Sequence, residues 1–397
     1  MAIYSIICEY NPFHNGHAFQ INSLKPNTVV CLMSGNVVQR GGFAVCDKYE
    51  RARAALECGA DLVLELPYPC SMLSAEYFAS AGVKILDKLG FTDYLSFGCE
   101  NENISVLEKI ASYLVSEEFE MNINALIASG PELSFAKARE NVIEKYLGEE
   151  CANALKSPNN ILAVEYIKAI KRLNSRIIPK PILRTGAGYH DENITDGFAS
   201  ATAIRSMIEK SNSISDVVPA TVCELYERLK YEGKLPSDEK KLDIAILSFL
   251  RKISVKELSQ YYDCNSVAEK IKKASLTAKS AEQLYDTACC INYTRTRIRR
   301  CVMAAFLGIK HSDAKAEPLY TTVLGLNPKG AELLSQIDEN CGITVITKPA
   351  HIKKYDGTEL YRRYMNEIIA DDIYSLTFED IAPSGESLRR SPVTVGF

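Results

Sequence analysis

The chain has 397 residues, of which 47% are hydrophobic and 24% are charged, and its formal net charge is −4. This composition supports a normal globular core without disulfide bonds, and the length favours two or three domains over one. The acidic balance argues against a protein that coats nucleic acid over its whole surface, although it permits a local basic face.

Neither the cysteines nor the N-terminus indicates an exported or membrane-bound protein. The thirteen cysteines contain no C-x-x-C pair, and several lie inside apolar runs, so we expect reduced core thiols of a cytoplasmic protein. The N-terminus MAIYSIICEY has no basic start and soon reaches Glu9, which argues against a signal peptide and against a membrane span. Ligand spacing predicts no metal site, and we expect no obligate protein partner.

The first half of the chain is predicted to be a doubly wound α/β domain. Up to about residue 205, short β-branched runs alternate with amphipathic segments, which is typical of parallel strands joined by crossover helices. We expect strands at residues 3–10, 28–35, 61–67 and 93–100 and helices at residues 48–60 and 75–90. A first helix is expected to begin near Asn15, and Gly59 and Pro67 supply stop signals for later elements.

The rest of the chain is predicted to be mostly helical. Residues 101–175 contain a clear helix at 157–173, followed by an extended segment at 176–184 and a helix at 200–210 capped by Ser200 or Thr202. Residues 216–310 are expected to be helical, and strand signals return from residue 319. We therefore predict a parallel-sheet domain (1–210), a basic helical domain (211–315) and a small C-terminal α/β appendage on the helical domain (316–397).

The stretch EYNPFHNGH, residues 9–17, places two of the five histidines directly behind the first predicted strand. Ligands of such folds bind at this edge of the sheet, and the free N–H groups of a helix starting there suit a phosphate. His14 and His17 share one side of the first turn, so both can donate hydrogen bonds to phosphate oxygens during displacement at phosphorus. Gly16 leaves room for a nucleotide. The alternatives are a capped helix start with a metal site or a core histidine, but the position behind the strand favours nucleotide binding.

Several motifs support a resemblance to a known family. The stretch PFHNGH resembles the H-x-G-H signature of the nucleotidyltransferase superfamily, and SATAIR (200–205) resembles its second signature. Six further or longer stretches make the chain similar to the bacterial tRNA(Met) cytidine acetate ligase family: EYNPFHNGH, MSGNVVQRG (33–41), GADLVLELP (59–67), FGCE (97–100), SPNNIL (157–162) and YTRTRIRR (293–300). Residues 8–11 depart from the pattern of many cofactor adenylyltransferases, which speaks against that activity.

The resemblance implies a Rossmann-like nucleotidyltransferase domain and a reaction in two steps. Acetate attacks the α-phosphate of ATP to give acetyl-adenylate and pyrophosphate, and the N4 amine of the wobble cytidine in elongator tRNA(Met) then takes the acetyl group. Magnesium (Mg²⁺) is inferred only from the chemistry of ATP. Two alternatives stay open, namely an adenylyltransferase that makes a nucleotide cofactor and a nucleotide-sensing RNA-binding protein.

The site residues that follow come partly from the resemblance and partly from position. The resemblance implies ATP contacts from Ile7, Cys8, Glu9, Tyr10, Asn11, Pro12, Phe13, His14, Asn15, Gly16, His17, Ala18, Phe19, Gln20, Gly98, Asn159 and Arg184. Ser200 and Arg205 are candidates for phosphate contact at the second signature, and His14, His17 and Arg205 are the predicted catalytic residues. From the residues alone, Gly98 equally marks a turn, and Asn159 and Ser200 are good helix caps.

Two further groups of residues have open roles. Gln39 and Arg40 follow the second predicted strand, where they either position acetate or the cytidine or belong to a solvated loop. Four arginines at the front of a predicted helix form the predicted tRNA-binding face, namely Arg295, Arg297, Arg299 and Arg300. Taken alone, such a cluster more often marks a solvated helix face. Candidate stacking platforms for an unpaired base are Tyr261, Tyr262 and Tyr293.

Overall fold

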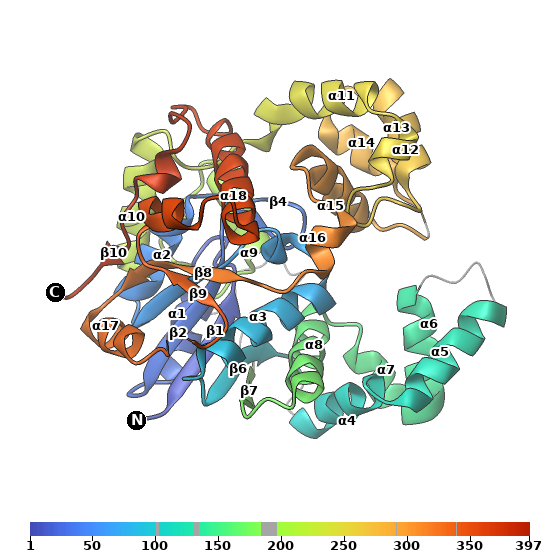
Figure 1. Cartoon of the computed structure of the whole chain (residues 1–397), viewed down its shortest axis with the longest axis horizontal. Coiled ribbons are helices and arrows are strands. Elements are labelled where there is room, and N and C mark those ends of the chain that lie inside the picture. Colours follow the sequence, from blue (N-terminus) through green and yellow to red (C-terminus); the bar gives the residue numbers. More distant parts are fainter. Residues whose placement is uncertain (101–102, 130–134, 184–196, 291, 339) are drawn as a thin grey trace.

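A mostly parallel sheet lies at the centre of the protein and carries helices on both faces (Figure 1). The computed structural model describes residues 1–397 with the exception of residues 101–102, 130–134, 184–196, 291 and 339. The strands are, in spatial order, β10 (Val393–Thr394), β8 (Tyr320–Leu326), β5 (Leu62–Leu66), β2 (Thr28–Ser34), β1 (Ile3–Cys8), β6 (Tyr94–Cys99) and β7 (Ile178–Leu183). The short strand β9 (Thr344–Ile346) also pairs with β8. Of these pairs, only β5 with β8 is antiparallel, so the predicted parallel sheet is confirmed.

The sheet is doubly wound because successive residues of its buried strands supply two different cores. Ile7 belongs to the core on one face, which is covered by α3 (Ala75–Leu89) and α8 (Pro158–Leu173). Ile6 belongs to the core on the other face, which is covered by α1 (Asn15–Ser23), α2 (Lys48–Glu57) and α10 (Ala220–Tyr231). Each fully buried aliphatic side chain in these cores contributes roughly 1.5–3 kcal/mol of transfer free energy.

The strand order changes direction at β1, which pairs with β2 on one side and β6 on the other. The helix α1 leads from β1 to β2, whereas β6 follows α3 on the opposite face. The carboxyl ends of β1 and β6 therefore diverge into a crevice, which is where ligands of open α/β sheets bind.

Two groups of helices extend the sheet domain, as Figure 1 shows. The first follows β6 and consists of α4 (Ile104–Leu114), α5 (Glu117–Ser129), α6 (Phe135–Leu147) and α7 (Glu149–Ala154). The second has its own core and consists of η2 (Glu239–Leu242), α11 (Asp243–Lys252), α12 (Val255–Leu258), α13 (Ala268–Thr277), α14 (Ala281–Ala288), α15 (Arg295–Phe306) and α16 (His311–Lys315). The helix α10 lies within the predicted region 211–315 but packs into the core of the sheet domain.

The C-terminal region has the predicted order of strand, helix and strand, but it packs differently from the prediction. Its elements after β8 include α17 (Pro328–Ser335), η3 (Pro349–Tyr355), α18 (Glu359–Ser375) and η4 (Glu386–Leu388). The expected appendage on the helical domain is wrong, because β8 pairs with β5 and becomes part of the central sheet. The physical reason is that β5 is buried along its whole length and would otherwise leave an open apolar edge.

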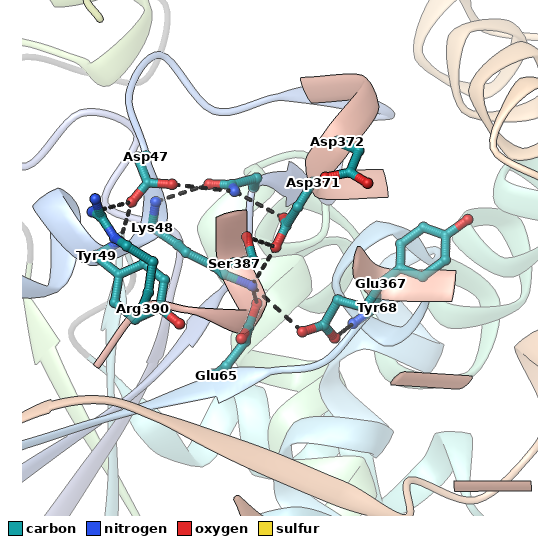
Figure 2. Close-up of polar contacts among 12 residues, drawn as sticks. Asp47, Lys48, Tyr49, Glu65, Tyr68, Glu367, Asp371, Asp372, Ser387 and Arg390 are labelled. Carbon is teal, nitrogen blue, oxygen red and sulfur yellow. Dashed lines mark hydrogen bonds and ion pairs between the residues drawn. The ribbon is translucent and has the colours of Figure 1, made fainter. Parts of the chain in front are cut away.

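A buried charge network fixes α18 against the sheet domain (Figure 2). Lys48, in the first turn of α2, is 2% exposed and pairs with Glu65 at 2.7 Å, Asp371 at 2.8 Å and Glu367 at 3.5 Å. Burial raises the pKa of Glu65 well above its ordinary value, and Glu367 raises it further, while Lys48 opposes both. The side chain of Asn36 donates to Asp371 at 2.8 Å and accepts the backbone N–H of Lys48 at 2.8 Å. The ammonium group of Lys48 thereby joins α2 to β5 and α18, and Asn36 joins the loop after β2 to the same network.

Two further observations bear on the predictions from composition. All thirteen cysteines are free thiols, most of them buried or partly buried, while Cys289 and Cys290 are exposed. Among the described residues, no helix combines the length and the apolar character that a membrane crossing requires.

We expect the substitution Lys48→Met to lower the free energy of unfolding by about 3–5 kcal/mol, because it leaves three buried carboxylates without their cation. Urea unfolding followed by circular dichroism measures this loss. The matched control is Lys84→Met, which removes the exposed pair between Lys84 and Glu317 and should cost about 1 kcal/mol or less. An equal loss of unfolding free energy in the two variants would contradict the prediction that the buried network contributes more stability than an exposed ion pair.

Candidate functional site

A cavity of about 970 Å³ opens at the carboxyl ends of β1, β6 and β7. The N-terminal turns of α1, α8 and α9 (Ala201–Glu209) line one part of it, and η2, α11, α14 and α15 line another. The hairpin β3 (Val37–Val38) and β4 (Gly42–Phe43) lies between these parts. Pockets for small ligands span about 300–1,000 Å³, so this cavity has room for a nucleotide together with a second substrate.

His14 and His17 stand at the start of α1 and both line the cavity. His14 is the N-cap of the helix, and its Nδ1 accepts the N–H of Gly16 at 3.1 Å. His17 returns the interaction, because its Nδ1 accepts the N–H of His14 at 3.3 Å. The two rings stack with centroids 3.6 Å apart, and the ring of Tyr10 packs on His17 at 4.7 Å. The two rings therefore lie on the same side of the helix start, as the sequence predicted, and their stacking and capping bonds join them into one unit.

The capping bonds fix the tautomer of both rings. A ring nitrogen that accepts an N–H carries no proton, so the neutral form of each ring holds its proton on Nε2. Each histidine is thus set as an N–H donor at Nε2. The expectation of free backbone N–H groups at this helix start is wrong, because the N–H groups of Asn15, Gly16, His17 and Ala18 all have acceptors. Imidazole donors replace them, and the helix dipole still favours an anion there.

The second helix start at the cavity belongs to α9. Ser200 is its N-cap and accepts the N–H of Ala203 at 3.1 Å, which confirms the predicted cap. Arg205 lies one turn further and donates to the carbonyl of Asn11 at 2.6 Å and to the hydroxyl of Thr202 at 3.0 Å. This helix packs in the same core as α1 and aims its dipole and a guanidinium at the cavity from a start beside that of α1.

Arginines gather around the middle of the cavity. Burial lowers the pKa of Arg205 below its ordinary value, and the charges of Arg40 and Arg299 add to this effect while Glu9 opposes it. Burial also lowers the pKa of Arg40, with Arg299 adding and Glu9 opposing. A bound anion would relieve this repulsion, so the arrangement is suited to phosphate groups.

The hairpin β3–β4 brings Gln39 and Arg40 into the cavity lining and rests on α15. Gly41 has φ +75, and a Cβ there would lie 2.5 Å from the Cα of Arg300, so only glycine allows this close approach. The backbone N–H of Gln39 donates to Oε1 of Glu9 at 2.7 Å, which joins the hairpin to the end of β1. The backbone of the hairpin is thus anchored, while the side chain of Gln39 is partly buried and that of Arg40 is exposed, so the role of these two side chains stays a prediction.

Arg51 is the important residue that the sequence interpretation missed. Its guanidinium is fully buried and donates to the carbonyls of Glu9 at 2.6 Å, Ser34 at 3.1 Å and Gly35 at 2.6 Å, and also to that of Cys46. It places a positive charge directly beneath the carboxyl ends of β1 and β2. One signal for this burial was available, because Arg51 shares a helix face with the small residues at positions 54, 55 and 58.

Gly98 and Asn159 also line the cavity. Gly98 is next to last in β6, and Asn159 is in the first turn of α8. The Nδ2 group of Asn159 donates to Glu100 at 2.7 Å, and Ser157 rather than Asn159 is the N-cap of α8. Asn159 therefore joins the end of β6 to α8 and is not a helix cap.

The predicted ATP residues divide into three groups. Those that line the cavity are Ile7, Cys8, Glu9, Tyr10, Asn11, His14, Gly16, His17, Phe19, Gln20, Gly98, Asn159 and Ser200. Those outside its lining are Pro12, Phe13, Asn15 and Ala18. Two of these anchor the loop, since Phe13 donates its N–H to the hydroxyl of Tyr226 and Asn15 donates to the carbonyl of Gly197. Arg184 lies outside the described residues.

The four predicted tRNA-binding arginines all have carboxylate partners. Arg295 pairs with Glu282 and with Asp286 at 2.7 Å. Arg297 and Arg300 both pair with Asp263, at 2.8 Å and 3.4 Å, and Arg299 pairs with Glu239 at 2.7 Å. The charge of this helix start is therefore largely balanced, and only Arg299 of the four lines the cavity.

The predicted stacking tyrosines differ in exposure. Tyr262 is buried and its hydroxyl accepts the N–H of Ser74 at 3.0 Å, so it is a core residue rather than a stacking platform. Tyr293 is partly exposed and carries the guanidinium of Arg297 over its ring at 5.2 Å. Of the three, Tyr261 and Tyr293 keep an accessible ring.

No group of three or more His, Cys, Asp and Glu side chains among the described residues is arranged to hold a metal ion. Carboxylates do line the cavity. The Mg²⁺ inferred from the chemistry of ATP therefore has no set of three such protein ligands among the described residues.

Comparison with known proteins gives consistent matches over the whole chain. The family model of the HIGH Nucleotidyl Transferases matches residues 1–387. The chain is 36% identical to the tRNA(Met) cytidine acetate ligases of Acetivibrio thermocellus and Halothermothrix orenii, with 96% of each chain covered in both cases. Its structure is similar to the crystal structure of apo TmcAL from Thermotoga maritima, with a TM-score of 0.93, 27% identity and full coverage of both chains. A crystal structure of the same protein bound with alpha-thio ATP matches with a TM-score of 0.91 and 26% identity, again over both complete chains.

We expect His14→Ala to lower the free energy of unfolding by about 1 kcal/mol, because the N–H of Gly16 loses its capping acceptor. His14→Asn should restore most of that loss, since asparagine is a strong N-cap, while it still removes the Nε2 donor. Urea unfolding of both variants tests this separation of capping from donation. If the two variants lost the same stability, the capping role of the imidazole would be refuted.

Proposed function

The chain belongs to the HIGH Nucleotidyl Transferase family and, within it, to the tRNA(Met) cytidine acetate ligases, and we propose that it acetylates tRNA(Met) in two ATP-dependent steps. In the first step acetate attacks the α-phosphate of ATP, which yields acetyl-adenylate and pyrophosphate. In the second step the N4 amine of the wobble cytidine in elongator tRNA(Met) attacks the acetyl carbon, which yields N4-acetylcytidine and AMP.

The observation that carries this proposal is the stacked pair of His14 and His17 at the point where the strand order reverses. Both rings are set as Nε2 donors, and Arg205 approaches the cavity from the start of α9, where it donates to the carbonyl of Asn11. Negative charge that develops on the phosphoryl oxygens would then meet fixed donors from both α1 and α9. Such preorganised donors stabilise the transition state of phosphoryl transfer more than the ground state.

Attack by acetate requires two anions to approach each other. A carboxylate and a triphosphate carry like charges and repel each other strongly. Distance and a high dielectric constant weaken this repulsion, and nearby cations screen it. Arg40 and Arg205, which line the cavity, supply that screening, and the buried Arg51 adds its charge from the carbonyls of Glu9, Ser34 and Gly35 outside the lining. Magnesium would enter with ATP as its counter-ion and not on a protein site.

The second step needs space for an RNA base beside the adenylate. The cavity provides this space between the hairpin, α9 and the helical domain, where Tyr285 and Arg299 line its wall. An anticodon-loop base is already unpaired, so it can enter without melting a duplex. The step requires no covalent protein intermediate, which agrees with a cavity built from donors and arginines. We also place the reaction in the cytoplasm, where this tRNA is used.

The alternatives account for less of the chain. An adenylyltransferase that makes a nucleotide cofactor would use the histidine pair but leaves the cavity wall from the helical domain without a role. A nucleotide-sensing RNA-binding protein would need no donor pair held in one tautomer. The names of the relatives also favour the acetate ligase.

The decisive experiment is exchange of labelled pyrophosphate into ATP, which should depend on acetate. The variant His17→Gln should reduce this exchange by about 100- to 1,000-fold, because it removes one preorganised donor. Glutamine at this helix position can still accept the N–H of residue 14, so the fold is retained. Affinity for tRNA(Met), measured by filter binding, should stay within about twofold, since the tRNA contacts assigned here involve no imidazole. Exchange that depends on a nucleoside monophosphate instead of acetate would support the cofactor adenylyltransferase.

A second prediction concerns the arginines of α15. Arg297→Glu should weaken tRNA binding and reduce the dependence of affinity on salt by about one phosphate contact. Filter binding over a series of salt concentrations measures both effects. Arg172→Glu is the control, because Arg172 is an exposed, ion-paired residue near the other end of α8 from the cavity. If the salt dependence of tRNA affinity were unchanged in Arg297→Glu, Arg297 would not belong to the tRNA interface.

A further inference from the structure

Glu9 occupies a special position at the end of β1. It lines the cavity between the histidine pair on one side and the hairpin residues Gln39 and Arg40 on the other. Its backbone carbonyl is held by Arg51 at 2.6 Å, and its side chain is held by the N–H of Gln39 at 2.7 Å. The carboxylate is therefore fixed at the junction of the nucleotide side and the helical-domain side.

One oxygen of this carboxylate remains available for a substrate. The hydrogen bond from Gln39 goes to Oε1, and no hydrogen bond to Oε2 occurs among the described residues. Glu9 is only partly buried and lines the cavity, so a ligand there can approach this carboxylate. A carboxylate oxygen in this situation can accept a proton or a hydrogen bond from a ligand.

Other acidic groups of the cavity are less suitable. Glu239 is bound by Arg299 and by the N–H of Phe43, and Glu282 is paired with Arg295. The remaining three are Asp238, Asp243 and Glu209. Asp238 and Asp243 each accept one backbone N–H, as Glu9 does, but they belong to the starts of η2 and α11 on the helical-domain wall and not to the strand end that precedes the histidine pair. Glu209 is exposed on the outer end of α9.

The histidines cannot replace Glu9 as a proton acceptor in this arrangement. The Nδ1 atoms of His14 and His17 are both occupied by backbone N–H groups, and the neutral rings hold their protons on Nε2. At the end of β1, next to the histidine pair, Glu9 therefore combines a fixed position, an oxygen without a hydrogen bond among the described residues and the capacity to take a proton.

The electrostatic setting favours proton uptake at Glu9. Burial raises the pKa of this carboxyl above its ordinary value, against the hydrogen bond from Gln39 and the charges of Arg40, Arg205 and Arg51. The phenol of Tyr166, on α8, also faces it and stays neutral, because burial raises the pKa of Tyr166. When nucleotide phosphates bind these arginines, the phosphate charge offsets the positive charge that lowers the pKa of Glu9. The pKa of Glu9 therefore rises further. A carboxylate whose pKa lies closer to neutrality is a better general base.

We propose that Glu9 is the catalytic base of acetyl transfer, accepting the proton that the N4 amine of the tRNA cytidine loses when it attacks the acetyl-adenylate. The proposal rests on the function proposed above. The bond between N4 and the acetyl carbon forms, and the bond between that carbon and the phosphate oxygen of AMP breaks. The proton of N4 passes to Oε2 of Glu9 and then to solvent, and AMP leaves as the phosphate anion. No oxidant, metal or further reactant is needed.

The test separates the two steps in the full-length protein with the variant Glu9→Gln. Glutamine keeps an oxygen for the N–H of Gln39 but cannot accept a proton. Transfer of labelled acetyl from enzyme-bound acetyl-adenylate to tRNA(Met) should fall by about 100- to 10,000-fold in single turnover. Acetate-dependent pyrophosphate exchange should fall far less, so that the ratio of the two losses is at least about 100.

The pH profile and two control variants complete the test. The transfer rate of the unaltered protein should rise with pH until Glu9 is ionised, with its midpoint above the ordinary pKa of glutamic acid, and the Glu9→Gln profile should be flat in that range. Glu9→Asp should recover part of the transfer, and the exposed Glu57→Gln should behave like the unaltered protein in both assays. Equal loss of exchange and transfer in Glu9→Gln, or undiminished transfer, would overturn the role of Glu9. Absence of acetate-dependent exchange in the unaltered protein would overturn the proposed function itself, and the role of Glu9 with it.

Discussion

Two buried cations in the first turn of α2 hold together the loops on which the site depends. Lys48 and Arg51 are three residues apart, so they lie on the same side of the helix, and both are almost completely buried. An isolated charge in such a place would cost several kcal/mol in desolvation. Lys48 avoids this cost with three carboxylates, and Arg51 avoids it with four backbone carbonyls. These contacts therefore fix the carboxyl ends of β1 and β2 in addition to the sheet pairing, which continues to Cys8 and Ser34.

This arrangement joins the C-terminal region to the chemistry of the cavity. Asp371 on α18 binds both Lys48 and Asn36, and Asn36 precedes the hairpin that carries Gln39 and Arg40. The carbonyl of Asn36 also accepts the N–H of Ala44 at the other end of that hairpin. A displacement of α18 would therefore also displace Arg40, although the two are far apart in sequence. The central sheet, its added strand β8 and the hairpin behave as one framework.

Features that depend on local sequence could be predicted, whereas features that depend on distant partners could not. The strands, the helix starts and the joint orientation of His14 and His17 follow from periodicity and from the position behind β1. The burial of Arg51 depends on carbonyls from residues 9, 34, 35 and 46, so a helix that looks like an ordinary surface helix gave only a weak signal. The edge to which β8 would add depends on which strand the rest of the fold leaves open. The strand itself was predictable but its partner was not.

The arginines of the chain fall into two electrostatic classes, and the difference bears on how each binds an anion. For Arg295 and Arg299, neighbouring carboxylates overcome the effect of burial and raise the pKa. For Arg40 and Arg205, burial and other arginines lower the pKa. A phosphate that binds Arg40 or Arg205 relieves the repulsion among the arginines, so its binding costs little free energy. A phosphate at the first class must displace a carboxylate, so part of its binding free energy is offset by the broken ion pair. On the proposed function, Arg40 and Arg205 would therefore favour a triphosphate, whereas the arginines of α15 would make weaker and more selective contacts with a nucleic acid backbone.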